Sequence, residues 1–201
     1  MSIVGRLPLP PGAVRRDVEV RGGPLAVVDV AGTGTPVVLV PGFTGSKEDF
    51  RLVLEPLAAT GRRAVAVDQR GQYESPGPDD EAAYAVDALA QDLLALLDAL
   101  GTGPVHLVGH SFGGLVSRAA VLAQPDAVRS LTLMCSGPAA LTGPRVELLP
   151  LLRPVLEQGG TTALADAVEA MGADDPRTQA LPDDVRAFLR ARMVASSGTA
   201  L

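Results

Sequence analysis

The sequence has 201 residues, enough for one hydrophobic core or for one core with an appended subdomain. Its residues are 47% hydrophobic and 20% charged, which excludes an intrinsically disordered chain. A net charge of −6 argues against nucleic acid and against an anionic membrane surface as the main partner. The single cysteine, Cys135, permits neither an intrachain disulfide nor a cysteine metal cluster.

The first residues and the hydropathy pattern predict no export and no membrane insertion. Residues 1–8 lack the basic start and the apolar core of a signal peptide. No apolar stretch is long enough to span a bilayer. We therefore expect a cytoplasmic protein.

Short apolar runs alternate with helical patterns up to about residue 140, which is typical of an α/β protein with a mostly parallel sheet. About six strands are expected, at residues 17–21, 25–30, 37–40, 64–67, 105–108 and 128–134. Gly22-Gly23 joins the first two as a hairpin signal. Helical spacing predicts helices over residues 46–59, 81–100 and 114–123. The polar residues 69–80, rich in proline and glycine, predict a loop.

The pattern changes after residue 140. Residues 145–158, 161–171 and 183–195 are rich in leucine and alanine with helical spacing, and no strand signal returns. We therefore expect an α/β core over residues 1–140 and an all-helical cap or lid over residues 141–201. The sheet of that core would be incomplete.

Residues 109–114 read Gly-His-Ser-Phe-Gly-Gly and fit the nucleophile elbow G-x-S-x-G. A serine at the tip of a tight strand-to-helix turn occupies sparsely allowed φ/ψ space, so its hydroxyl projects from the sheet edge. Gly109 and Gly113 would let neighbouring backbone pass without a Cβ clash. The helix that follows would point its positive end at a developing oxyanion. A Gly-Ser turn that only opens a helix is the alternative, and the flanking strand and helix favour the elbow.

Two further stretches carry a family resemblance. Residues 38–45, Val-Leu-Val-Pro-Gly-Phe-Thr-Gly, end the third predicted strand, and residues 68–75, Asp-Gln-Arg-Gly-Gln-Tyr-Glu-Ser, follow the fourth. With the elbow, they make residues 15–140 similar to the α/β-hydrolase superfamily, in its capped branch. The resemblance implies Ser111 as the nucleophile, and the main-chain amides of Phe43 and Phe112 as the oxyanion donors.

The loop at residues 68–75 resembles the Asp-x-Arg-Gly loop of that superfamily, in which the arginine braces loops near the site. We expect an Asp68–Arg70 pair that folds a surface loop and takes no part in catalysis. Tyr73 replaces a glycine that is common in relatives, and Pro41 stands where many relatives carry histidine.

The triad of this fold runs serine, acid, histidine along the chain, whereas both histidines here, His106 and His110, precede Ser111. We expect both to be structural. The side chain of His110, within the elbow, should point away from the serine hydroxyl, and His106 should lie among core side chains or at a helix contact. No carboxylate follows the strand at residues 128–134 either. The resemblance therefore implies an acid and a histidine beyond residue 201, and a chain that is inactive alone.

Three functional hypotheses remain open. The first is a serine hydrolase acting on an ester or a related small apolar acyl compound, with no cofactor and no metal, since no ligand spacing is present. The second is a non-catalytic domain on the same scaffold that binds a ligand or a partner. In the third, a complementing chain or a second copy pairs with the exposed edge strand at residues 128–134, and the isolated chain is oligomeric or prone to aggregation.

Overall fold

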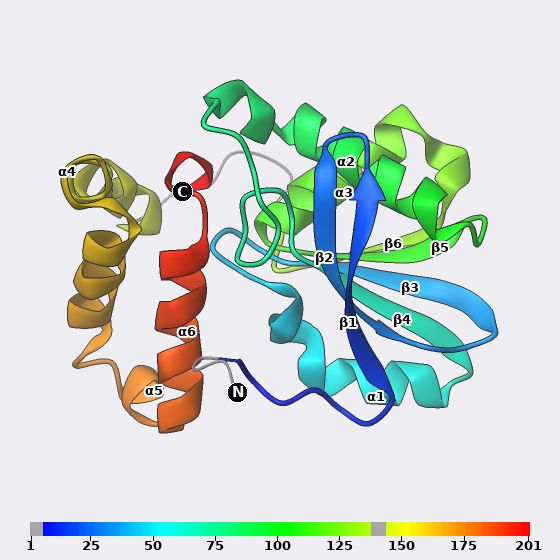
Figure 1. Ribbon diagram of the computed structural model, residues 1–201, viewed down its shortest axis with the longest axis horizontal. Coiled ribbons are helices and arrows are strands. Elements are labelled where there is room, and N and C mark those ends of the chain that lie inside the picture. The colour runs from blue at the N-terminus through cyan, green and yellow to red at the C-terminus, as the bar shows by residue number, and fades with distance from the viewer. Residues whose placement is uncertain (1–5, 138–143) are drawn as a thin grey trace.

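The computed structural model describes residues 6–137 and 144–201, and a six-stranded mixed sheet lies at its centre (Figure 1). The strands are β1 (Ala13–Val20), β2 (Gly23–Val30), β3 (Gly34–Val40), β4 (Arg62–Val67), β5 (Val105–His110) and β6 (Val128–Met134). Their spatial order is β1-β2-β4-β3-β5-β6. The hairpin of β1 and β2 joins antiparallel to β4, and β4, β3, β5 and β6 run parallel. The predicted fold class is confirmed.

Hydrophobic cores lie on both faces of the sheet because successive strand residues point to opposite sides. Val38 packs in a cluster with residues of α2 (Val86–Leu100) and α3 (Phe112–Ala123). Leu39 packs in a second cluster with Phe50 and Leu54. The last two come from the 3₁₀ turn η1 (Lys47–Phe50) and from α1 (Arg51–Ala59). Figure 1 shows α2 and α3 on one side of the sheet and α1 on the other.

The helix predicted over residues 46–59 begins as η1 and continues as α1. Ser46 is at its N-cap position, and Oδ2 of Asp49 accepts from the main-chain N–H of Ser46 at 3.2 Å, as in a capping box. The helix predicted over residues 81–100 begins as a second 3₁₀ turn, η2 (Glu81–Tyr84), and continues as α2. Gly101 ends α2 in the left-handed conformation, with φ of 64°.

A layer of helices lies beside the sheet at the left of Figure 1. It consists of α4 (Pro144–Gly172), α5 (Pro176–Gln179) and α6 (Asp183–Ala195). Two short 3₁₀ turns remain: η3 (Pro125–Ala127) precedes β6, and η4 (Gly198–Ala200) follows α6. Gly160, with φ of 68°, divides α4 into two helices. The expected boundary between core and lid, at residue 140, lies outside the described residues. No helix within residues 6–137 and 144–201 is both long and apolar enough to cross a membrane.

The end of α6 is tied to the loop that follows β4. The N–H of Tyr73 donates to the Ser196 hydroxyl at 3.0 Å, and the N–H of Ser197 donates to the Gly71 carbonyl at 2.8 Å. The ring of Phe188 on α6 lies edge to face against Tyr73, with 5.6 Å between ring centroids. Helix α6 therefore packs on the same loop that borders the candidate site.

Candidate active site

Ser111 stands in the turn between β5 and α3, in a conformation that few non-glycine residues adopt. Its φ is 51° and its ψ is −118°. The turn is fixed by two main-chain hydrogen bonds. The N–H of Ser111 donates to the Met134 carbonyl at 2.9 Å, and the Ser111 carbonyl accepts from the N–H of Gly114 at 2.9 Å. This backbone places a serine side chain at the carboxyl edge of the sheet, beside the N-terminus of α3.

Two glycines allow the turn to pack closely. A Cβ added at Gly113 would lie 2.5 Å from the Val40 carbonyl oxygen, and one at Gly109 would lie 2.6 Å from Cα of Gly114. Both distances are shorter than real contacts allow, so neither position accepts a side chain without a shift of backbone. The absence of side chains here brings the start of α3 against the end of β3.

The loop after β3 lies against the serine. A Cβ added at Gly42 would be 3.1 Å from Cβ of Ser111, so the loop backbone borders the side chain of Ser111 directly. The rings of Phe43 and Phe112 meet edge to face, with 6.4 Å between centroids. Among the described residues, the main-chain N–H groups of Phe43 and Phe112 donate to no protein acceptor. Two main-chain N–H donors near Ser111 are thus without an acceptor among the described residues, one in the loop after β3 and one at the start of α3.

Both histidines are accounted for by structural contacts. Nδ1 of His106 lies 2.7 Å from the Ser130 hydroxyl, across β5 and β6. The ring of His110 packs on Gly42, since Nδ1 would lie 3.1 Å from a Cβ built there. In the part of the chain that the structure describes, no hydrogen bond joins Ser111 to a histidine or a carboxylate. A base for the serine hydroxyl is therefore not found among these residues.

The loop after β4 carries two buried glutamines that contact the loop after β3. Nε2 of Gln69 donates to the Pro41 carbonyl at 3.0 Å, and Nε2 of Gln72 donates to the Gly42 carbonyl at 2.8 Å. Tyr73 in the same loop has φ of 41°, in the left-handed region that favours glycine. Sequence reasoning singled out neither glutamine, because a lone glutamine in a loop carries no pattern.

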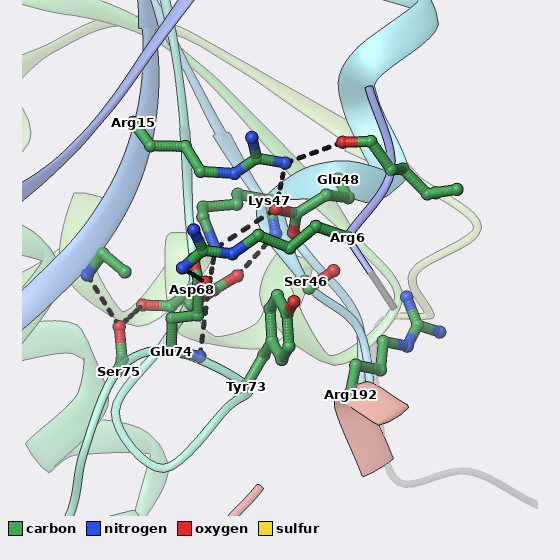
Figure 2. A network of polar contacts seen from close by, with 12 residues as sticks. Arg6, Arg15, Ser46, Lys47, Glu48, Asp68, Tyr73, Glu74, Ser75 and Arg192 are labelled. Atoms are coloured by element: carbon green, nitrogen blue, oxygen red, sulfur yellow. Dashed lines mark hydrogen bonds and ion pairs between the residues drawn. The ribbon is translucent and has the colours of Figure 1, made fainter. Parts of the chain in front are cut away.

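A buried charge network underlies this loop (Figure 2). The fully buried ammonium of Lys47 lies 2.6 Å from Oδ2 of Asp68 and 2.7 Å from Oε2 of Glu74, with Oε1 of Glu48 at 3.4 Å. Arg15 contacts Glu48 at 3.4 Å, and Arg6 contacts Glu74. The network joins the segment after β3 to the loop after β4, and therefore holds the two loops beside Ser111 together.

The members of this network differ in how readily they ionise. Burial raises the pKa of the Asp68 carboxyl to about 7, although Lys47 opposes the change. Burial lowers the pKa of the Lys47 ammonium, but attraction to Asp68 and Glu48 outweighs it, so the pKa is raised overall. Burial would raise the pKa of Glu74, but its hydrogen bond with Lys47 lowers it overall. The network therefore favours the ionised forms of Lys47 and Glu74, whereas burial makes Asp68 easier to protonate than an exposed aspartate.

The expected Asp68–Arg70 pair is wrong. Asp68 is fully buried and pairs with Lys47, whereas Arg70 reaches α2 and pairs with Asp92. The side chain of Asp68 also accepts from the main-chain N–H of Lys47 at 2.6 Å, which fixes it on η1. Arg70 does brace a loop, but against a helix and through a different acid.

A large groove lies between the loops at the edge of the sheet and the helices α4 and α6. Its volume is about 1160 Å³. Its lining is mostly apolar, with some charged side chains, and includes Phe43, Leu152, Leu156, Leu164, Val168, Met193, Glu81 and Arg153. A smaller pocket of about 210 Å³ is lined by Phe43, Phe112, Gln69, Gln72 and Tyr84, among others. Within residues 6–137 and 144–201, no three His, Cys, Asp or Glu side chains gather in a way that could hold a metal ion.

The sequence profile of the alpha/beta hydrolase fold matches residues 35–183. The chain belongs to the α/β-hydrolase fold family. Within this family it is 35% identical over 131 residues to the mouse (Mus musculus) sn-1-specific diacylglycerol lipase ABHD11, a match covering 64% of the chain and 42% of the lipase. The matched regions span less than half the length of the first curated relatives, at 38%, 42% and 35%.

Solved structures of other α/β-hydrolases have the same fold. An esterase from Exiguobacterium antarcticum superposes with a TM-score of 0.74 at 21% identity, covering 92% of the chain and 69% of the esterase. An epoxide hydrolase from an endophytic Streptomyces superposes with a TM-score of 0.62 at 32% identity. That match covers 81% of the chain and 50% of the epoxide hydrolase. The lipase, the esterase and the epoxide hydrolase are all hydrolases, and their names indicate different substrates.

Proposed function

We propose that the chain carries the nucleophile and the oxyanion hole of a serine hydrolase that acts on an ester or a related acyl compound. Ser111 attacks the carbonyl carbon, and the main-chain amides of Phe43 and Phe112 donate to the oxyanion that forms. The observation that carries the proposal is the strained backbone of Ser111, with φ of 51°. Its Cβ lies 3.1 Å from the position that a Cβ on Gly42 would take. A serine that only opened a helix would need neither the strain nor the two unused amides beside it.

The chemistry of a serine nucleophile favours an acyl substrate over an epoxide, although an epoxide hydrolase is among the structural neighbours. Attack by a serine hydroxyl on an acyl carbon gives an ester, which water can then cleave to regenerate the enzyme. Attack on an epoxide carbon would give an ether, which water does not cleave under the same conditions. Ser111 at the tip of the turn therefore supports ester, thioester or lactone cleavage.

The groove between core and lid supports a small apolar acyl group as the substrate. Its lining includes Leu152, Leu156, Leu164 and Met193 from the lid, and Phe43 beside the proposed oxyanion hole. Apolar walls stabilise a hydrocarbon chain by removing it from water. The helices α4 and α6 would thus form a lid that binds the acyl group while the core performs the reaction.

We place the general base and its orienting acid outside residues 1–201. No histidine within the described residues reaches Ser111, and the matched regions span less than half of the first curated relatives. The chain alone would then react slowly once and turn over poorly. A non-catalytic binding role is the competing account, and the same missing base favours it.

Covalent labelling in the presence of added imidazole separates the two accounts, since the solute supplies the missing base. Wild type, Ser111→Ala and Ser136→Ala are incubated with a small alkyl fluorophosphonate, and the intact mass is followed over time. Ser136 is the matched control, because its hydroxyl packs against Gly114 at the same edge of the sheet.

We expect one adduct on wild type and on Ser136→Ala, formed faster with imidazole. Ser111→Ala should form none, because the nucleophile is gone. Labelling that persists in Ser111→Ala, or a wild type that stays unmodified with imidazole present, would contradict the proposal. The second of these outcomes would favour the binding account.

A further inference from the structure

Two buried glutamine amides hold successive carbonyl groups of the loop after β3. Gln69 and Gln72 are each 7% exposed. Nε2 of Gln69 donates to the Pro41 carbonyl at 3.0 Å, and Nε2 of Gln72 donates to the Gly42 carbonyl at 2.8 Å. The amide of Gln72 is itself oriented, because its Oε1 accepts from the main-chain N–H of Gln69 at 3.1 Å. That contact leaves only the NH₂ group to face Gly42.

The carbonyl of Gly42 and the N–H of Phe43 belong to one peptide unit. This unit is planar and trans, so its C=O and its N–H point in opposite directions. A donor that holds the Gly42 carbonyl on the Gln72 side therefore turns the Phe43 N–H to the other side. Gly42 also borders Ser111, since a Cβ there would lie 3.1 Å from Cβ of Ser111.

We propose that Gln72 is a positioning residue of the oxyanion hole: its hydrogen bond to the Gly42 carbonyl keeps the Phe43 N–H turned toward the oxygen that becomes negative on reaction at Ser111. Gln69 supports it by holding the Pro41 carbonyl and the Gln72 amide. The inference rests on the proposed serine hydrolase function. It assigns a role to a side chain that does not touch the substrate's reacting atoms.

A flexible residue makes such a restraint necessary. Gly42 has no side chain, so the peptide unit that follows it rotates more easily than in other residues. A rotated unit would point the Gly42 oxygen at the developing oxyanion and turn the Phe43 N–H away. The N–H of Gly45 is the other donor to the Gly42 carbonyl, at 3.0 Å, so part of the restraint remains without Gln72.

Loss of the Gln72 donor should slow reaction at Ser111 about 10- to 100-fold. A single oxyanion donor is worth about 100- to 1000-fold in rate, and the bond from Gly45 retains part of the orientation. Substrate binding in the apolar groove should be almost unchanged, because the effect arises as negative charge develops. A loss in the maximal rate constant of phosphonylation by the alkyl fluorophosphonate, with an unchanged half-saturating concentration of that reagent, would therefore distinguish positioning from a general disturbance of the loop.

The phenylalanines allow a direct observation of both donors. The chain has four, Phe43, Phe50, Phe112 and Phe188, so ¹⁵N-phenylalanine labelling gives four main-chain amide signals in an NMR spectrum. Phe43 and Phe112 are the proposed donors. Phe50 and Phe188 are 4% and 2% exposed and report whether the core and the lid are folded.

Spectra are recorded before and after phosphonylation with the alkyl fluorophosphonate and imidazole. The adduct on Ser111 carries the phosphoryl oxygen that mimics the oxyanion. We expect the Phe43 and Phe112 signals of wild type to move downfield. In Gln72→Met, which keeps the volume but not the donor, Phe112 should move as in wild type and Phe43 should move much less, because the Gly45 N–H retains part of the restraint.

Gln91→Met is the matched control, because Gln91 is an exposed glutamine on α2, and it should behave as wild type. Gln72→Leu is the second variant, since its apolar side chain cannot donate at any pH, and it should resemble Gln72→Met. An equal downfield shift of Phe43 in wild type and in either folded Gln72 variant would overturn the inference alone. A wild type that forms no adduct would overturn the proposed function, and this inference with it.

Discussion

Replacing Lys47 by methionine removes the charge at the centre of the buried network while keeping a side chain of similar length and volume. The Lys47 side chain is fully buried, and so are the carboxylates of Asp68 and Glu48 that surround it. In the variant, these carboxylates and Glu74 lose the ammonium that balances them. We expect a large loss of stability caused by charge, with little contribution from a cavity.

The magnitude follows from the two short contacts of the ammonium, at 2.6 Å to Asp68 and 2.7 Å to Glu74. A hydrogen bond to a charged group contributes about 1.5–3 kcal/mol, and removing one partner of a buried pair costs about 3–5 kcal/mol. We therefore expect the free energy of unfolding to fall by about 4 kcal/mol. With a urea dependence of about 2 kcal/mol/M, the unfolding midpoint should fall by about 2 M.

Urea unfolding followed by far-ultraviolet circular dichroism measures this change. Arg153→Met is the matched control, because Arg153 pairs with Glu81 and Glu157 but is 66% exposed. An exposed pair is worth little, so the control should change the free energy of unfolding by less than about 1 kcal/mol. A midpoint for Lys47→Met within about 0.5 M of the control would refute the reasoning that the network is buried and balanced by Lys47.

Two further predictions concern Asp68 and β6. Burial raises the pKa of the Asp68 carboxyl to about 7, above about 3.9 in the unfolded chain, so the folded state binds this proton more readily and stability falls as pH rises from about 4 to about 7. Asp68→Asn should lose this pH dependence of the free energy of unfolding. Urea unfolding of both proteins at pH 4.5 and 7.5 checks it, and an equal change between the two pH values in both proteins would contradict it. The outer edge of β6 has no partner strand among the described residues, and Leu133 and Met134 are 41% and 43% exposed, so we expect the isolated chain to self-associate. A single monomeric species in sedimentation velocity at all concentrations would show that this edge is protected.

The sequence predicted the sheet well because buried strands and tight turns leave local patterns. The apolar run at residues 37–40 lies within β3, and residues 128–134 form β6 with the predicted bounds. The alternation of faces could be read from the same residues, since Val38 and Leu39 pack in different clusters. The starts of elements were predicted with less accuracy, since β1 begins at Ala13 and not at residue 17, and a 3₁₀ turn precedes α1 and α2.

The environment of the candidate site was less predictable, because it depends on contacts between residues far apart in the chain. The motif located Ser111, but no local pattern indicates that Lys47 lies under Asp68, or that Arg70 pairs with Asp92 on α2. Asp68 and Arg70 are two residues apart, which favoured a local pair, yet each finds its partner about twenty residues away. The two glutamines were missed for the same reason.

Because Lys47 is buried, proteolysis at this residue reports local opening of the chain. Lys47 is the only lysine in the 201 residues, so a lysine-specific protease has one cleavage site in this sequence. In the folded chain that site is closed, with the Lys47 side chain 0% exposed and its ammonium held by two carboxylates. Cleavage into residues 1–47 and 48–201 therefore requires the two loops beside Ser111 to separate, and its rate follows the population of that open state. Digestion with a lysine-specific protease therefore measures the population of the state in which the two loops beside Ser111 are separated.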